Sequence, residues 1–501
     1  MSQRRRISFA ALTSLAALSV LAVRNLETWI CRVDALRTFD YGPALAAWLV
    51  HRLSVGEALY QDVHQTFPLV DVYNPLGFYL VWALSRFFRP GPMSALEGGR
   101  VLTILSTLMV CLAVWALARR SGVSGPAAAI AALTFAIAPI LEPWGFEFRV
   151  DMLALAFDMI GLWAFWQGLT YWSVGLFALS FLTKQNQLTG IAAVVLFLLL
   201  RREVWRAVVL GGLWAALVAG IVFVLHLVWP FYLQNAFGGL TSLYDIAAPA
   251  DFLILIVFAH FAIVVLCGTA LFAARRELGL IACFLLAGLV QAVLSSLHWC
   301  SYLYYFLSPL AAATCLAAGK IEDLLIYAED FPRLAQIWFG LALTFVIVCQ
   351  DNMPFSSGSP PPLGLRALAA SNVGCASCNR GSWEDAAAIQ FLRSVRGTVL
   401  SDEPFLPFEI NPDKVRILSV FFLHAAVERG HVSEQALLLQ IKERRLAAIA
   451  LFHSDLGARY RIYSLLWPRL EQAIAENYSF VPGIGPPYVL LPNVGHPTSA
   501  R

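Results

Sequence analysis

Apolar stretches of transmembrane length recur along this sequence, and they constrain its fold more than any other feature. A membrane-spanning helix needs about 20 mostly apolar residues, with a lower limit near 17. The longer stretches are Ile7–Val23, Val101–Leu117, Met152–Leu169, Ala207–Trp229, Phe252–Phe272, Leu278–Leu297, Tyr302–Ala318 and Leu334–Cys349. Shorter ones are Pro126–Leu141, Thr170–Leu182 and Leu188–Leu200. Together they predict a polytopic α-helical membrane protein with about 11 transmembrane helices.

The composition supports this prediction, because 59% of the residues are hydrophobic and only 13% are charged. A soluble chain of 501 residues needs more charge to cover its surface, so the excess apolar residues must face lipid. The net charge of +3 is small and its Lys and Arg residues form no single tract, which argues against a nucleic-acid partner.

The basic residues of the short loops predict the orientation, because Lys and Arg concentrate on the cytoplasmic side. The loops assigned to the inside hold Arg4, Arg5, Arg6, Arg119, Arg120, Arg201, Arg202, Arg206, Arg275, Arg276, Lys320 and Arg333. This assignment requires the short aromatic segment Asn74–Phe88 to lie in the outer interface rather than to cross. No small-residue cleavage site follows Val23, so the first span is expected to stay uncleaved. We therefore expect a multi-pass protein of the cytoplasmic (inner) membrane with its N-terminus inside and its C-terminal region outside.

The tail of the chain differs in character from the rest. We expect a transmembrane domain over residues 1–350, with a first periplasmic loop at 24–100, then a Pro/Ser/Gly-rich linker at 351–381. Residues 382–501 alternate between helical and strand patterns, which predicts a small periplasmic α/β domain with a partly parallel sheet. Its expected elements are helices at Ser382–Val395, Ser433–Arg445 and Arg459–Asn477, and strands at Thr398–Leu400, Ala447–Phe452 and Tyr488–Leu491. It has no phosphate-binding loop or nucleophile elbow, so support or acceptor binding suits it better than catalysis.

Cys375 and Cys378 form a CxxC in the polar stretch before this domain. A disulfide is permitted outside the cytoplasm, and a lone CxxC is weak support for a redox or zinc site. The structural role is favoured, and the oxidation state of the pair stays open.

The first outer loop carries the most informative motifs. Asp40 precedes an apolar-periodic run, Ala44–Leu53, which predicts a second interfacial helix. The run is followed by Gly56-x-x-Leu-Tyr60-x-Asp62, and then by Asp71 and the Tyr73-x-Pro that leads into the aromatic segment. Further along, Arg149-Val-Asp151 precedes a span, Lys184 follows one, and His298 and Tyr302 precede Pro309.

This order of motifs resembles the GT-C superfamily, in particular the bacterial relatives of protein O-mannosyltransferases and of the aminoarabinose transferase that modifies lipid A. The resemblance covers about the first 320 residues and, more loosely, the expected periplasmic domain. It implies an inverting hexosyl- or pentosyltransferase that takes a sugar from a polyprenyl-phosphate carrier and acts on a lipid, glycan or protein acceptor. The sugar, the acceptor, the carrier length and the oligomeric state stay open, although a role in building a cell-envelope glycan is expected.

The resemblance also implies roles for individual residues. Asp40 matches the catalytic acid of the first loop and is expected to be the general base; the alternative is a cap for the following helix. Asp151 is either a second acid of the site or a helix cap paired with Arg149. Lys184 and Arg149 are expected to bind the donor phosphate, because positive charge at the outer face is otherwise disfavoured. The alternative for Lys184 is that its side chain only snorkels to the interface. The expected substrate-binding residues are Tyr60, Asp62, Asp71, Tyr73, His298 and Tyr302. For the group Tyr302, Tyr304 and Tyr305, an aromatic belt that anchors a helix in the headgroups is the favoured interpretation.

No cofactor is certain, and a divalent metal stays open. Metal-binding relatives place an acid just before the proline of the Tyr-x-Pro motif, where this chain has Asn74. Asp62, His64, Asp71 and His298 offer ligand atoms, but their spacing matches no recognised metal signature, so no metal ligand is assigned.

Two other classes of function compete with a transferase. A transporter or flippase of a lipid-linked substrate should show internal repeats and ionisable residues at mid-membrane depth. The sequence shows no repeats, and Asp158 and His226 are the main candidates for such ionisable residues. A non-catalytic membrane scaffold is the other alternative, because Tyr41 stands where the family often has a second acid beside Asp40.

Overall fold

The computed structural model describes most of the chain as helices. The described residues are 8–35, 41–63, 73–88, 91, 93–237, 244, 246–273, 279–298, 302–348, 386–402, 406–411, 413–418, 420–428, 430, 432–451, 467–483 and 488–493. The predicted linker at 351–381, with the Cys375/Cys378 pair, lies outside them.

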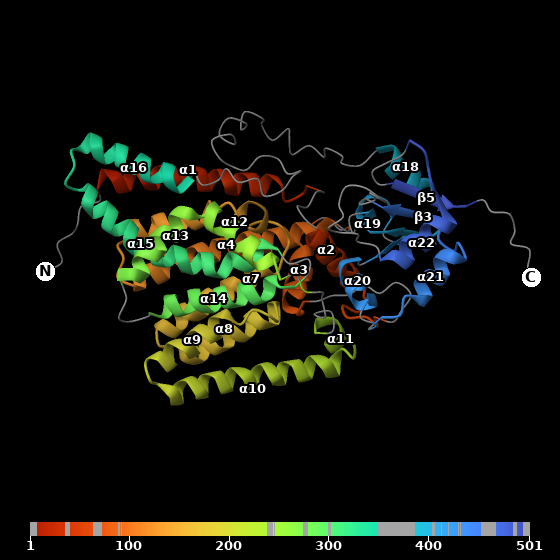
Figure 1. The fold of residues 1–501 in the computed structure, drawn as a ribbon, viewed down its shortest axis with the longest axis horizontal. Helices are drawn as coiled ribbons and strands as arrows, with labels where there is room; N and C mark the ends of the chain where they lie inside the picture. The colour runs from red at the N-terminus through yellow and green to blue at the C-terminus, as the bar shows by residue number, and fades with distance from the viewer. Residues whose placement is uncertain are drawn as a thin grey trace, which may run out of the picture.

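The helices up to residue 348 form one elongated bundle (Figure 1). They are α1 (Phe9–Cys31), α2 (Tyr41–Ser54), α3 (Leu76–Ser85), α4 (Met93–Arg120), α5 (Gly125–Ala136), α6 (Leu141–Trp144), α7 (Asp151–Trp166), α8 (Thr170–Thr183), α9 (Thr189–Leu200), α10 (Val204–Val228), α11 (Tyr232–Ala236), α12 (Ala248–Ala259), α13 (Phe261–Ala273), α14 (Leu280–Ser296), the 3-10 helix η2 (Leu303–Phe306), α15 (Leu307–Ala328) and α16 (Arg333–Val348).

The helices α1, α4 and α10 are each long and apolar enough to cross a membrane. A fourth candidate is the pair α12 and α13, which is bent by 93° at a short break, so the predicted run Phe252–Phe272 is not one straight helix. Shorter apolar helices, among them α5, α8, α9, α14 and α16, coincide with the other predicted runs. The helical class is confirmed, and the count of about 11 crossings stays a prediction.

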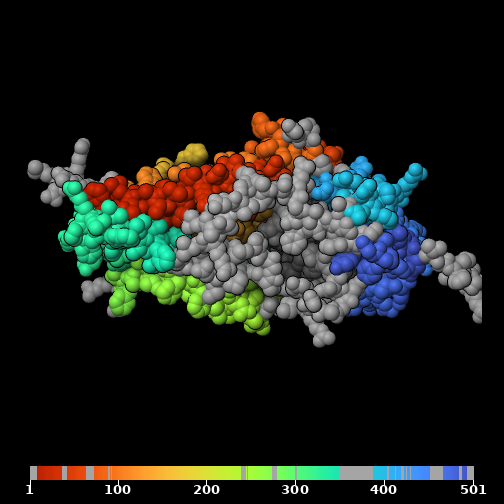
Figure 2. Space-filling model, turned by 90° about the horizontal axis from the view of Figure 1, so that it is seen from above, coloured from red at the N-terminus to blue at the C-terminus, as the bar shows by residue number. Residues whose placement is uncertain are grey.

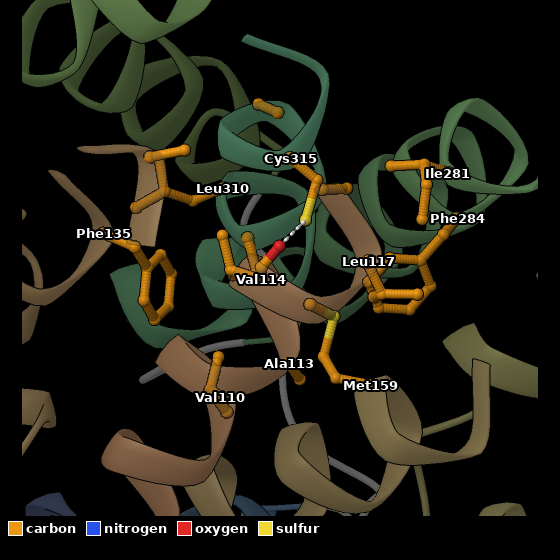
Figure 3. Packing of buried hydrophobic residues seen from close by; sticks show 14 of the residues in the cluster. Val110, Ala113, Val114, Leu117, Phe135, Met159, Ile281, Phe284, Leu310 and Cys315 are labelled. Atoms are coloured by element: carbon orange, nitrogen blue, oxygen red, sulfur yellow. Dashed lines mark hydrogen bonds between the residues drawn. The ribbon is translucent and has the colours of Figure 1, made fainter. Parts of the chain in front are cut away.

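Small side chains let the central helices approach closely. The core between α4, α5 and α15 is built around Val114, Phe135 and Leu310, with alanines filling the contacts (Figure 3). The Cys315 thiol lies 3.8 Å from the Val114 carbonyl oxygen, which joins α15 to α4. Because lipid tails are as apolar as these side chains, close packing rather than exclusion of water stabilises such a bundle.

The predicted second interfacial helix is present as α2, but it is buried on more than one face. Consecutive residues from Ala44 to Val50 are all buried, so the one-sided pattern expected of a helix lying on a membrane surface is absent there. One side of α2 packs on α3 and α4, and the other meets the C-terminal domain, where Trp48 and Phe408 have ring centroids 6.1 Å apart. Burial lowers the pKa of the nearby His51, and the charges of Asp413 and Glu57 oppose that shift.

The C-terminal domain is a five-stranded sheet with helices against it. Its strands, in spatial order, are β2 (Val415–Ile417), β1 (Val399–Ser401), β3 (Ala448–Leu451), β5 (Tyr488–Pro492) and β4 (Tyr478–Phe480). Its helices are α18 (Ala386–Ser394), α19 (Leu406–Glu409), α20 (Val420–Glu428), α21 (Gln435–Lys442) and α22 (Pro468–Asn477). Strand β1 is parallel to β2 and β3, whereas β5 is antiparallel to β3 and β4. The predicted small α/β domain with a partly parallel sheet is therefore present.

This domain caps one end of the helical bundle (Figure 2). The helices α2 and α3 lie at that end, beside α19 and α20 in the view of Figure 1. Tyr73, just before α3, packs against two buried apolar clusters, and each of these clusters includes residues of the C-terminal domain. The first outer loop and the C-terminal domain thus form one packed layer over the end of the bundle.

Close packing beneath this layer gives a test of the fold. A Cβ added at Gly99 of α4 would lie 2.1 Å from Cγ of Phe148, a distance that forces neighbouring atoms to move. We expect Gly99→Ala to destabilise the purified protein, since overpacking a close-packed site typically costs about 1–3 kcal/mol. A lower midpoint of thermal unfolding in detergent would measure this.

The control is Gly212→Ala on α10, where an added Cβ meets nothing within 4 Å. Equal unfolding midpoints for the two variants would contradict the contact between α4 and Phe148.

Candidate functional site

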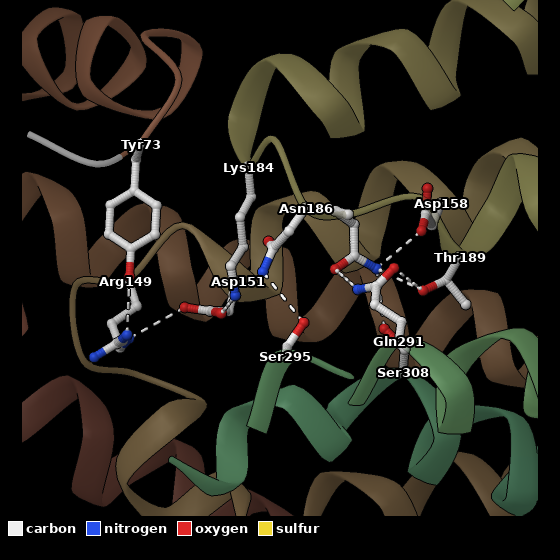
Figure 4. Close-up of polar contacts among 11 residues, drawn as sticks. Tyr73, Arg149, Asp151, Asp158, Lys184, Asn186, Thr189, Gln291, Ser295 and Ser308 are labelled. Carbon is white, nitrogen blue, oxygen red and sulfur yellow. Dashed lines mark hydrogen bonds and ion pairs between the residues drawn. The ribbon is translucent and has the colours of Figure 1, made fainter. Parts of the chain in front are cut away.

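Three charged side chains from two segments of the chain meet at the capped end of the bundle (Figure 4). Asp151 is the first residue of α7, Arg149 lies two residues before it, and Lys184 follows the last residue of α8. Arg149 Nε donates to Asp151 Oδ2 at 3.1 Å, and Lys184 Nζ donates to Asp151 Oδ1. We call these three residues the ion cluster.

The ion cluster is almost closed to solvent. Lys184 is 3% exposed, Asp151 6% and Arg149 9%. A buried charge is costly unless it is paired, and here each oxygen of the carboxylate has a cationic donor. The three side chains sum to a charge of +1, so the cluster favours an anion.

Aromatic rings line the two cations. The Arg149 guanidinium lies 4.0 Å from the ring centroid of Tyr304 and 5.1 Å from that of Trp144. Lys184 Nζ lies 4.7 Å from the Tyr304 ring centroid and 4.4 Å from that of Tyr305. Ring faces attract cations and keep water away, which strengthens electrostatic interactions at this point. Tyr304 and Tyr305 therefore belong to the candidate site rather than to a lipid-facing aromatic belt.

The first outer loop reaches the ion cluster through Tyr73. Its hydroxyl accepts a hydrogen bond from Arg149 Nη2 at 3.1 Å, and its carbonyl accepts one from the Tyr60 hydroxyl at 2.8 Å. The next residue, Asn74, donates to the Phe181 carbonyl at 2.6 Å near the end of α8. Asn74 also accepts from the Tyr232 hydroxyl at 2.7 Å. These bonds fix the loop against α8, close to Lys184.

The structure brings together half of the residues predicted for the site. Those in or next to the ion cluster are Tyr60, Tyr73, Arg149, Asp151 and Lys184. Tyr302 lies at its edge, 5.5 Å from Trp144 between ring centroids, whereas the His298 ring contacts Tyr244 in a tilted arrangement, 5.4 Å between ring centroids. Asp62 follows Gln61, whose carbonyl accepts from Asn235 at 2.7 Å.

Asp40 and Asp71 lie outside the described residues, as does His64. Asp40 directly precedes α2, which begins at Tyr41. The roles predicted for Asp40 and Asp71 therefore stay predictions. No group of three or more metal-ligating side chains occurs among the residues that the structure describes.

A second polar network lies deeper in the bundle and was not part of the predicted site. Asp158 Oδ2 accepts from Gln187 Nε2 at 2.9 Å (Figure 4). It also accepts from the Gly190 backbone N–H at 3.1 Å. Gln187 also donates to Ser308 of α15 at 3.0 Å, and Gln291 of α14 accepts from Leu188 at 2.9 Å. The network thus ties α7, α14 and α15 to the turn between α8 and α9, and Lys184 begins that turn. The sequence indicated this network only through an acidic residue within an apolar run, because the hydrogen-bond partners of Asp158 lie far from it in the chain.

Comparison with known proteins identifies related families and folds. Residues 73–229 match the family model described as dolichyl-phosphate-mannose-protein mannosyltransferase. The structure is similar to ArnT from Cupriavidus metallidurans, solved bound to undecaprenyl phosphate and in the apo state. Each alignment has a TM-score of 0.58 and 14% identity and covers 96% of this chain and 98% of that one.

The oligosaccharyltransferase AglB from Archaeoglobus fulgidus, in complex with an inhibitory peptide and a dolichol-phosphate, aligns over 98% of this chain and 75% of its own. The TM-score is 0.49 and the identity 13%. No curated protein matches the sequence.

The Asp158 network predicts a graded effect of substitution on stability. Asp158→Leu leaves the Gly190 N–H and the Gln187 amide without this acceptor, and each buried unsatisfied donor costs about 1–3 kcal/mol. Asp158→Asn keeps one acceptor oxygen and should be milder. We expect the midpoint of thermal unfolding in detergent to fall in the order wild type, Asp158→Asn, Asp158→Leu.

Asp323→Asn is the matched control, because the Asp323 side chain is 61% exposed and should be replaceable without loss. An unfolding midpoint for Asp158→Leu equal to that of the wild type would disprove a structural role for the network.

Proposed function

We propose that this chain, a member of the GT-C superfamily of membrane glycosyltransferases, transfers a sugar from a polyprenyl-phosphate donor to a lipid, glycan or protein acceptor. We place the reaction at the outer face of the cytoplasmic membrane, with inversion at the anomeric carbon. The observation that carries the proposal is the buried ion cluster, in which Lys184 and Arg149 share the carboxylate of Asp151.

Two buried cations suit a phosphate leaving group. As the bond between the sugar and the phosphate breaks, negative charge grows on the phosphate oxygens, and fixed cations in a water-poor site stabilise that charge. Lys184 contributes a compact charge, and Arg149 contributes a planar fork suited to two phosphate oxygens. The nearby rings of Tyr304 and Tyr305 limit solvation and so increase the effect.

Asp151 fits a supporting role in this arrangement. Both of its oxygens already accept from the cations, so it keeps Lys184 and Arg149 in place while no donor is bound. With this geometry, Asp151 is better suited to hold the phosphate-binding side chains than to orient the acceptor directly. Asp151 would act on the donor through its two neighbours.

Asp40 is our candidate for the general base. It would accept the proton from the acceptor hydroxyl or amine as that atom attacks the anomeric carbon. The bond to the phosphate breaks on the opposite side, and the phosphate leaves toward Lys184 and Arg149. This assignment rests on the resemblance of the first outer loop to the GT-C pattern and on the place of Asp40 directly before α2.

The donor class has independent support from two sources. The family model that matches residues 73–229 is named for transfer from a dolichyl-phosphate sugar. The ArnT structure with the same fold contains undecaprenyl phosphate. We propose further that Tyr60, Asp62, Asp71, Tyr73, His298 and Tyr302 bind substrate, and that the C-terminal domain contributes to acceptor binding.

A transporter or flippase of a lipid-linked substrate is the second candidate, because broken helices often line transport sites. The 93° bend between α12 and α13 is such a break, and the buried His260 lies at it. Measuring sugar transfer and substrate translocation side by side in proteoliposomes distinguishes the two candidates.

The first prediction from this proposal concerns the base. Asp40→Asn should reduce sugar transfer by ~10²–10⁴-fold, the usual contribution of a positioned base, while donor binding stays unchanged. Transfer is measured in membranes with a panel of polyprenyl-phosphate sugars. Asp34→Asn, an exposed acid of the same loop, is the control and should retain activity. Full transfer by Asp40→Asn would remove Asp40 from the mechanism.

The second prediction concerns the phosphate. Lys184→Ala should weaken donor binding about tenfold or more, since hydrogen bonds to charged groups contribute roughly 1.5–3 kcal/mol. Lys184→Arg keeps the charge and should bind more tightly than the alanine variant. Donor affinity is measured on folded, monodisperse protein, and Lys320→Ala serves as the control because Lys320 pairs with Asp323 on the exposed surface of α15. An unchanged donor affinity for Lys184→Ala would count against a phosphate role.

A further inference from the structure

Arg100 is the largest side chain that is fully buried in the described part of the protein. It lies on α4, and its guanidinium donates through Nη1 to the carbonyls of Arg32 at 3.0 Å and Val33 at 3.1 Å. The same nitrogen also donates to the carbonyl of Ala35. These carbonyls lie in the turn that follows Cys31, the last residue of α1, and the Arg32 carbonyl also accepts from the Ala35 backbone N–H at 3.1 Å. Arg100 therefore fixes the path by which the chain leaves α1.

The other side of the guanidinium binds Glu147. Its Nη2 lies 3.2 Å from Glu147 Oε2 and its Nε 3.3 Å from the same oxygen. Glu147 is 2% exposed and precedes Arg149 by two residues. One guanidinium thus joins the end of α1 to the segment that carries Arg149 and Asp151.

We propose that Arg100 and Glu147 are positioning residues that hold the end of α1, from which the chain continues toward Asp40, against the segment that carries Arg149 and Asp151. The inference rests on the proposed function, in which Asp40 is the base and the ion cluster receives the phosphate. Ala35 is held by Arg100, and Asp40 follows it by only five residues, a span of at most ~18 Å when fully extended. On the other side of Asp40 the chain enters α2, which is packed between α4 and the C-terminal domain.

The chemistry of arginine explains why this position needs that residue type. Only a planar group with five N–H donors can bind several carbonyls on one side and a carboxylate on the other. Lysine keeps the charge but lacks the fork. A buried ion pair typically stabilises a protein no more than apolar side chains of similar volume. The Arg100–Glu147 pair is therefore better explained by the geometry that it imposes on the two segments than by a gain in stability.

The test compares Arg100→Lys, Arg100→Gln and Glu147→Gln in the purified full-length protein. We expect kcat to fall in the order wild type, Arg100→Lys, Arg100→Gln, with a loss of about 10- to 100-fold, because a misplacement of about 1 Å can cost that much. The donor dissociation constant should stay unchanged, because Lys184 and Arg149 remain. A merely structural role would not separate kcat from donor affinity in folded protein.

Arg86 provides the matched control. It lies at the end of α3, is exposed, and stacks on Trp82 with its guanidinium carbon 3.8 Å from the ring centroid. Arg86→Lys and Arg86→Gln should leave both kcat and donor affinity unchanged.

Each outcome has a defined meaning. A wild-type kcat in folded Arg100→Lys and Arg100→Gln overturns the inference, and so does a loss of donor affinity equal to the loss of kcat. If the Arg100 variants do not fold, Glu147→Gln decides by the same two criteria. Full transfer by Asp40→Asn would instead overturn the proposed function, so the two failures are distinguishable.

Discussion

A carboxylate held between two cations, away from water, organises the capped end of this molecule. Asp151 begins α7, Lys184 directly follows α8, and Arg149 reaches the first outer loop through the Tyr73 hydroxyl. Removing one partner from such a cluster leaves an uncompensated buried charge, which is why the segments must come together as a unit. The aromatic rings, the turn held by Asp158 and the packed outer layer all serve to keep this cluster closed.

The layer above the cluster consists of segments that are distant in sequence. The C-terminal domain covers α2. Tyr73 contacts apolar residues on both sides of the boundary between this domain and the helical bundle. Arg100 connects the end of α1 to the segment of Glu147, directly beneath the layer. A substrate bound at the cluster would therefore meet groups whose spacing is determined by buried contacts rather than by the outer loops alone.

Charge and hydropathy predicted much of this arrangement from the sequence. Lys184 and Arg149 stood out because the predicted topology puts these cations at the outer face, where cations are disfavoured, and the structure places both on Asp151. The resemblance to the GT-C superfamily is confirmed by the fold and by the family model. The roles of the individual residues, and the side of the membrane on which they lie, stay predictions.

The features missed from the sequence depend on contacts between distant segments. Tyr304 and Tyr305 looked like an aromatic belt, since nothing local distinguishes a ring facing headgroups from one facing a buried lysine. The burial of α2 on both sides depends on the C-terminal domain, which begins more than 300 residues later. The break at His260 and the partners of Asp158 likewise have no signature in one sequence.

The central claim is that the ion cluster receives the donor phosphate, and a structure of the protein with bound polyprenyl phosphate, determined by electron cryomicroscopy in lipid nanodiscs, tests it most directly. The account predicts density for the phosphate within hydrogen-bonding distance of Lys184 Nζ and the Arg149 guanidinium, beside Tyr304. A phosphate bound elsewhere, with the Lys184–Asp151–Arg149 contacts unchanged, would contradict it.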